Sequence, residues 1–190
     1  MRIIAKLSVP ALLIMLAVPQ WGCRKVPEEH TSLALDPGKD PGPPKKRLTL
    51  MWHHHSTGDN LLAGGLRAAI DANNLEFYDL NYKEGKVGDY VVGDLTDPNE
   101  FPTNFNTPKY FEVLRTWELD GKDKPQHDII MFKSCFPASD IKSDKMLADY
   151  KKWYNSMLPT FKEHKDILFI PMSTPPLNSG ETSPENAARA

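Results

Sequence analysis

The sequence predicts an α/β fold, with a parallel sheet at the centre of a flavodoxin-like three-layer α/β/α domain. Short apolar runs alternate along the chain with segments whose apolar residues recur at the three- and four-residue spacing of a helix face. One run, residues 128–134, is almost continuously apolar, as is typical of a strand covered on both faces. Strands that alternate with helices indicate parallel βαβ units and a sheet between two helix layers.

Each element follows from a local pattern. Strands are expected over residues 47–53, 75–80, 128–134 and 166–172. Helices are expected over residues 58–73, 108–119 and 143–163, the last interrupted at Pro159. Thr107 and Pro108 suit the N-cap and the first position of the second helix.

Residues 81–106 are rich in Gly, Asp, Asn and Pro, so we expect a long surface loop there. Unstructured loops of that length are usually functional. Cys135 is expected to be a buried strand residue, with no disulfide to Cys23.

The first 23 residues have the order of a signal peptide. Arg2 and Lys6 precede an apolar run over residues 7–18, which is too short for a comfortable membrane span. Cys23 follows the small residue Gly22, so it is a candidate for lipid attachment as in bacterial lipoproteins. Plain secretion after nearby cleavage is the alternative. Either outcome places the domain outside the cytoplasm, secreted or in the cell envelope, with membrane contact only through a lipid anchor.

Residues 24–46 carry many prolines and charges, so we expect a disordered tether before a domain at residues 47–190. The formal net charge is −2 and the basic residues are spread along the chain. Such a distribution favours a solvated surface over a nucleic-acid interface. No nucleic-acid partner is therefore predicted.

The C-terminal segment begins a helix that the last residues barely continue. Ser183, Pro184 and Glu185 have the form of an N-cap, a first-turn proline and an early acidic residue. One isolated turn is unstable in water, and a sheet of four strands leaves an edge uncovered. We therefore expect the chain to be a fragment of a longer protein, truncated at its C-terminus.

Ser56 is the most suggestive residue, because it lies where the first predicted strand turns into the first predicted helix. In open parallel sheets, ligands bind beyond the carboxyl ends of the strands. A serine there lies near helix N–H groups that can stabilise an oxyanion, but its hydroxyl needs a base to become a good nucleophile. The alternative is that Ser56 only caps the helix.

The histidines before Ser56 raise the question of a metal site. Successive strand residues point to opposite faces, so His53, His54 and His55 cannot all reach one ion, although His53 and His55 could share a face with Asp59 nearby. We predict that they pack or hydrogen-bond around the turn, and that no metal or other cofactor binds. His127 and His164 are expected near the surface or at strand edges.

Three motifs carry a family resemblance: HHSTGDN at residues 54–60, MFKSCFP at 131–137 and TPPL at 174–177. In this order they resemble bacterial secreted proteins of the SGNH (GDSL-type) hydrolase superfamily, over residue 48 to the end. The resemblance implies a flavodoxin-like fold. It also implies that Ser56 is the nucleophile and that its backbone N–H is an oxyanion donor.

The resemblance is incomplete at the other catalytic positions. It implies a glycine donor after the second strand, for which Gly88 and Gly93 are both candidates. An oxyanion asparagine is absent after the third strand, where Ser134 is a weak substitute. No Asp-x-x-His pair occurs between Leu177 and Ala190. Without a base, a loss on the order of a thousandfold or more is expected.

Two functions therefore compete. The first is an extracytoplasmic ester hydrolase that acts through Ser56 on an acyl or acetyl ester of a small molecule or carbohydrate, impaired in this chain. The second is a non-catalytic carbohydrate- or ligand-binding module on the same fold, with Asp89, Asp94 and Asp97 available to grip a polar ligand.

Overall fold

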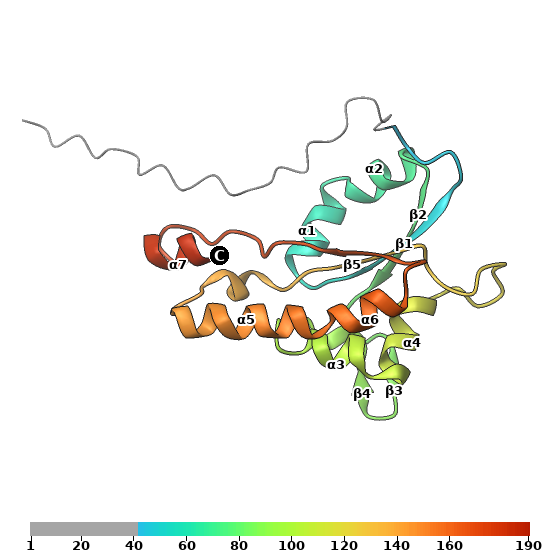
Figure 1. Cartoon of the computed structure of the whole chain (residues 1–190). Helices are drawn as coiled ribbons and strands as arrows, with labels where there is room; N and C mark the ends of the chain where they lie inside the picture. Colours follow the sequence, from blue (N-terminus) through green and yellow to red (C-terminus); the bar gives the residue numbers. More distant parts are fainter. Residues whose placement is uncertain (1–41) are drawn as a thin grey trace, which may run out of the picture. The chain divides into compact units, whose positions relative to one another are not determined.

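A computed structural model describes residues 42–190 of the chain (Figure 1). The expected signal peptide, Cys23 and most of the expected tether lie outside the described residues. The described residues belong to one contact unit, Pro41–Ala190.

The centre of the fold is a parallel sheet of four strands in the order β2-β1-β5-β6. β1 (Leu48–His53) pairs with β2 (Leu75–Leu80) on one side and with β5 (Ile129–Phe132) on the other. β6 (Leu168–Pro171) pairs with β5. Counted in chain order the sheet reads 2-1-3-4, which is the flavodoxin-like order. The predicted fold class is confirmed, with each strand inside its predicted range.

Helices lie on both faces of this sheet (Figure 1). On one face, α1 (Thr57–Ala63) and α2 (Leu66–Ala72) pack over Leu50 and Trp52 of β1. The opposite face carries a larger, aromatic core that receives Met51 of β1. The alternation along β1 follows from the two-residue period of a strand. The helices on this second face are α3 (Phe101–Asn106), α4 (Pro108–Thr116), α5 (Asp144–Ser156) and α6 (Leu158–Glu163).

Two predicted helices are each divided in two. Residues 58–73 split into α1 and α2 because Gly64 and Gly65 intervene, and Gly65 has a φ of 100°, which a helix cannot accommodate. Residues 143–163 split into α5 and α6 at Met157, with Pro159 in the first turn of α6. The Ser143 hydroxyl caps α5, whereas Thr107 makes no side-chain cap bond to α4.

The stretch expected to be a long loop is largely structured. It holds a hairpin of β3 (Lys86–Val87) and β4 (Tyr90–Val91), a 3-10 turn η1 (Val92–Asp94) and then α3. Phe101 and Phe105 of α3 are buried in the aromatic core. Their burial stabilises a helix that the Pro- and Asn-rich local sequence does not favour.

Two further single-residue expectations were wrong. His127 is buried, with Nε2 2.9 Å from the carbonyl oxygen of Trp117. Burial lowers its pKa to about 4, although this backbone contact opposes the shift. Cys135 lies beyond β5 and is partly exposed, with no disulfide among residues 42–190.

After β5, a second 3-10 turn, η2 (Phe136–Ser139), leads towards α5. The final helix is α7 (Pro184–Arg189), where the Ser183 hydroxyl accepts a hydrogen bond from the backbone N–H of Asn186. The predicted cap at Ser183 is confirmed.

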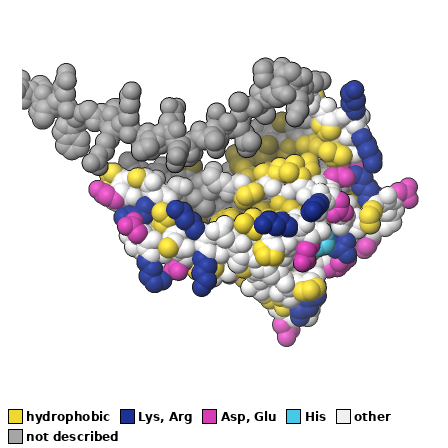
Figure 2. Space-filling view, in the orientation of Figure 1, with side chains coloured by type: hydrophobic (Ala, Val, Ile, Leu, Met, Phe, Trp, Pro, Cys, Tyr) yellow, Lys and Arg dark blue, Asp and Glu magenta, His cyan; other side chains and the backbone are white. Residues whose placement is uncertain are grey.

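On the face seen in Figure 2, acidic and basic side chains are interspersed around a band of hydrophobic ones. Leu168 on the edge strand β6 is 57% exposed. Within the described part of the chain, no helix has the length and apolar character needed to cross a membrane.

Candidate functional site

Ser56 follows the end of β1 in a strained turn. Its backbone has a φ of 47° and a ψ of −93°, and the chain enters α1 at the next residue. A positive φ is uncommon for a residue with a side chain and costs about 1–3 kcal/mol. The Ser56 hydroxyl makes no cap bond to α1, and the side chain is partly exposed. The hydroxyl is therefore free of the capping role that was the alternative for this residue.

The three histidines before Ser56 diverge, as the strand period requires. His53 is fully buried against the ring of Phe101, with centroids 5.9 Å apart. Within residues 42–190, neither of its ring nitrogens forms a hydrogen bond. Burial lowers its pKa to about 3, helped by His55 and opposed by the nearby carbonyls of Val92 and Gly93. His53 is thus a neutral core residue near neutral pH.

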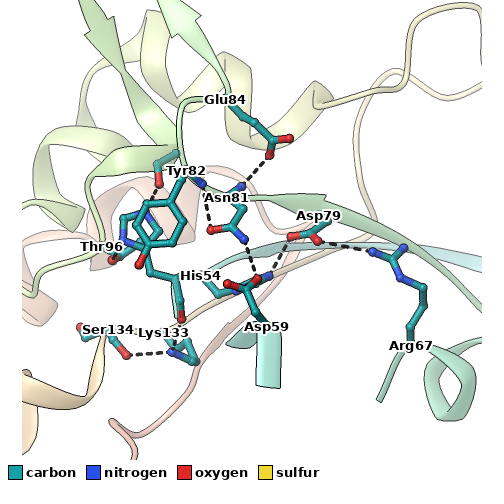
Figure 3. A network of polar contacts seen from close by, with 12 residues as sticks. His54, Asp59, Arg67, Asp79, Asn81, Tyr82, Glu84, Thr96, Lys133 and Ser134 are labelled. Atoms are coloured by element: carbon teal, nitrogen blue, oxygen red, sulfur yellow. Dashed lines mark hydrogen bonds and ion pairs between the residues drawn. The ribbon is translucent and has the colours of Figure 1, made fainter. Parts of the chain in front are cut away.

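His54 points to the opposite side, where it connects α1 to the end of β2. Its Nε2 lies 2.7 Å from Oδ1 of Asp79 (Figure 3). The centroid of its ring lies 4.2 Å from that of Trp52. Gly58 of α1 passes so close that a Cβ there would be 2.0 Å from Nδ1 of His54. The glycine of the HHSTGDN motif is therefore explained by the approach of the helix to this ring.

His55 is enclosed by the segment that follows β2. Its Nε2 contacts the carbonyl of Gly93 and its Nδ1 lies 3.0 Å from Oγ1 of Thr96. Because a carbonyl only accepts, Nε2 carries the proton and Nδ1 accepts from Thr96. Burial lowers the pKa of His55, and the Gly93 carbonyl opposes the shift. His55 is held as a neutral ring next to Ser56.

Tyr82 stacks on His55, with ring centroids 3.7 Å apart and 19° between the planes. Partial burial raises the pKa of the phenol, and the nearby backbone N–H of Ser56 opposes that shift. Tyr82 therefore lies near the N–H that the family resemblance assigns to the oxyanion.

The loop that carries Tyr82 is held by side chains on both sides (Figure 3). Nδ2 of Asn81 donates to Asp59 of α1 at 2.7 Å, and the N–H of Asn81 donates to Glu84 at 2.7 Å. The N–H of Lys83 donates to Asp94 at 2.6 Å. These bonds hold the loop in place beside the Ser56 turn.

Lys133 closes the site from the β5 side. It directly follows the last residue of β5 and is only 1% exposed. Its Nζ donates to the backbone carbonyls of His55 and Ser134, each at 3.1 Å. Burial lowers the pKa of Lys133, while nearby Cys135 and Asp59 oppose the shift. Sequence reasoning missed this residue, although a lysine at the end of an apolar strand was a visible signal.

The oxyanion candidates differ in their surroundings. Gly93 is next to the site, but its N–H already donates to Glu84 O at 3.1 Å and its Cα faces Asn81 O, leaving no room for a side chain. Gly88 is exposed between β3 and β4, with a φ of 63°. The Ser134 hydroxyl is buried and forms no hydrogen bond in the described part of the chain. As an oxyanion donor, Gly93 would first have to release Glu84.

Within residues 42–190, no group of His, Cys, Asp or Glu side chains has the arrangement to hold a metal ion. The comparisons with known proteins add no relative: no family model, curated protein or solved structure matches this chain. The site combines a serine whose hydroxyl caps no helix with a buried lysine, a stacked tyrosine and a neutral histidine.

Proposed function

We propose that this protein is an extracytoplasmic serine ester hydrolase of the SGNH type. Its substrate would be an acyl or acetyl ester of a small molecule or a carbohydrate. The observation that supports this most is the state of Ser56. Its backbone is strained, its side chain is partly exposed, and its hydroxyl caps no helix, at the carboxyl end of an inner strand of the sheet. Residues held in strain by their surroundings are concentrated at functional sites.

In this reaction the Ser56 oxygen attacks the ester carbonyl carbon and loses its proton to a base. The alcohol then leaves with a proton, and water hydrolyses the acyl-serine to the acid. The backbone N–H of Ser56 would donate to the oxyanion. The resemblance implies that the base is the histidine of an Asp-x-x-His pair.

The test uses the full chain, p-nitrophenyl acetate and a fluorophosphonate probe that labels activated serines. We expect Ser56 to be the labelled residue in peptide mass spectra. Where the chain tested supplies the Asp-x-x-His base, Ser56→Ala should reduce kcat/KM on the order of a thousandfold, because the members of a triad act as a unit. Ser179→Ala is the matched control, because it removes a hydroxyl from an exposed turn. Equal hydrolysis by Ser56→Ala and the wild type would rule the proposal out.

A binding module is the second candidate, and one observation favours it. In the described residues no hydrogen bond joins the Ser56 hydroxyl to a histidine, and His54 and His55 already have other partners. Binding of a polysaccharide, measured by affinity electrophoresis and unchanged by Ser56→Ala in a chain without esterase activity, would support a module. Failure to bind any cell-wall or polysaccharide fraction would count against it.

A further inference from the structure

Lys133 is a buried cation with an unusual set of partners. It is 1% exposed, and among the described residues it forms no ion pair with a carboxylate. Lysine is rarely buried in this way unless its ammonium group is paired. Both of its hydrogen bonds go to backbone carbonyls, those of His55 and Ser134. The ammonium group is therefore hydrogen-bonded by backbone atoms alone among the described residues.

The two carbonyls lie two residues beyond the ends of the adjacent strands β1 and β5. The last register pair between β1 and β5 is His53 with Phe132. Beyond it, the N–H of Lys133 donates to His53 O at 3.1 Å, and its Nζ reaches two residues further to His55 O. Lys133 thus extends the connection between the strands past the sheet, up to the residue before Ser56.

The His55 carbonyl also receives the first hydrogen bond of the following turn. The N–H of Gly58 donates to it at 2.9 Å, and the N–H of Asp59 donates to Ser56 O at 2.9 Å. The peptide between His55 and Ser56 is therefore held from the β5 side by Lys133 and from the α1 side by Gly58. This is the peptide whose orientation sets the φ of Ser56.

The groups around the ammonium are Asp59 from α1, Cys135 from its own segment, and the neutral His55 from the turn after β1. Tyr82, which interacts with both Asp59 and Cys135, faces the same region from the loop after β2. Neither Asp59 nor Cys135 accepts a hydrogen bond from Nζ, so no side chain in the described part of the chain competes with the two carbonyls for its N–H groups.

We propose that Lys133 is a positioning residue for Ser56, holding the His55 carbonyl so that Ser56 keeps its strained, positive-φ conformation and its hydroxyl stays free. Without Lys133, the turn would relax towards an ordinary N-cap, in which the serine hydroxyl bonds to the helix N–H groups. A hydroxyl engaged in this way is a weaker nucleophile. This inference rests on the proposed function, because it concerns the reactivity of Ser56.

The experiment compares the full wild-type chain with Lys133→Met, which keeps an unbranched side chain, one atom shorter, and removes the ammonium N–H donors. We expect fluorophosphonate labelling of Ser56 to be about tenfold slower or more, the loss expected for a hydrogen bond from a charged donor. For p-nitrophenyl acetate, kcat should fall while KM changes little. Lys133→Arg, which restores N–H donors, should recover part of the rate.

The matched control is Ile130→Val, which removes one buried methyl group from the same strand without touching the Ser56 turn. Its labelling rate should equal that of the wild type, so a general loss of stability is separated from positioning. If Lys133→Met does not fold, Lys133→Gln takes its place, since its shorter amide cannot span both carbonyls, and the expectation is the same.

Amide hydrogen exchange provides a readout that does not need activity. Lys133→Met should accelerate exchange of the Gly58 and Asp59 N–H groups about tenfold, with no change at the Met146 N–H of α5. If the wild type is never labelled but exchange is faster in Lys133→Met, the proposed function is wrong and the positioning role of Lys133 stands. Unchanged labelling together with unchanged exchange would overturn the inference.

Discussion

The ring of Tyr82 lies flat on the ring of His55, with centroids 3.7 Å apart and planes inclined by 19°. Because Thr96 and Gly93 hold the two nitrogens of the same imidazole, His55 is fixed on three sides. The residue before Ser56 therefore has little conformational freedom, and this restricts the turn at Ser56 as well. Tyr82 itself is 45% exposed, so one side of this arrangement faces solvent.

Tyr82→Ala should raise the pKa of His55 towards 6.5. Burial is the main cause of the lowered pKa, and removal of the ring lets water reach the imidazole. The stability of the fold should fall by about 1 kcal/mol through loss of the stacked pair. Titration of the His55 ring by NMR measures the shift. Tyr82→Phe is the control, since it keeps the stack. An unchanged pKa in Tyr82→Ala would contradict the prediction.

Ser56→Gly should give a more stable protein than Ser56→Ala, by about 1 kcal/mol. Glycine adopts the φ of 47° without the strain that any side chain suffers there. Both variants lack the hydroxyl, so the comparison isolates the backbone. Urea unfolding of the two proteins measures the difference. Equal midpoints would mean that the turn relaxes without cost.

Gly58→Ala should destabilise the fold by about 1–3 kcal/mol, the usual cost of overpacking. The new methyl group would be 2.0 Å from Nδ1 of His54, and that ring is held by its contact with Asp79. Thermal unfolding is the measurement. Gly180→Ala serves as the control, because nothing lies within 4 Å of a Cβ at that position. A harmless Gly58→Ala would show that His54 can move away freely.

Acid should destabilise this protein through its buried neutral histidines. The pKa of His53 is lowered to about 3 and that of His127 to about 4, so between these values and pH 6.5 only the unfolded chain binds the protons. Above pH 6.5 neither histidine makes the free energy of unfolding depend on pH. Below pH 6.5 each one lowers that free energy by about 1.4 kcal/mol per pH unit, until the pH reaches its pKa in the folded state.

His53→Leu should remove the contribution of one histidine to the pH dependence of the free energy of unfolding. At pH 7 the variant should unfold within about 1 kcal/mol of the wild type, since the replaced imidazole has no hydrogen bond among the described residues. Denaturant unfolding at pH 7 and pH 5 checks both statements. A slope equal to that of the wild type would show that His53 already binds its proton in the folded state.

Local patterns in the sequence were enough for the sheet and for the position of Ser56. The apolar runs that form β1, β2, β5 and β6 are bounded by turn residues, and each run can be recognised from a few consecutive residues. The Ser183 cap was equally local. In contrast, the prediction of a long loop over residues 81–106 was wrong. The helix there depends on Phe101 and Phe105, which enter a core built by distant segments.

The state of Ser56, by comparison, was decided only in the tertiary structure. The sequence shows a serine at a strand-to-helix turn and leaves open whether it caps the helix. The residue before this positive-φ serine is held by partners from elsewhere in the chain: Lys133 reaches His55 across 78 positions, and Gly93 and Thr96 reach the same residue across 38 and 41. Hydrophobic periodicity reports which face of an element is buried, because burial repeats with the period of the element. A buried lysine or histidine instead needs one specific partner, and only the folded chain brings the two together.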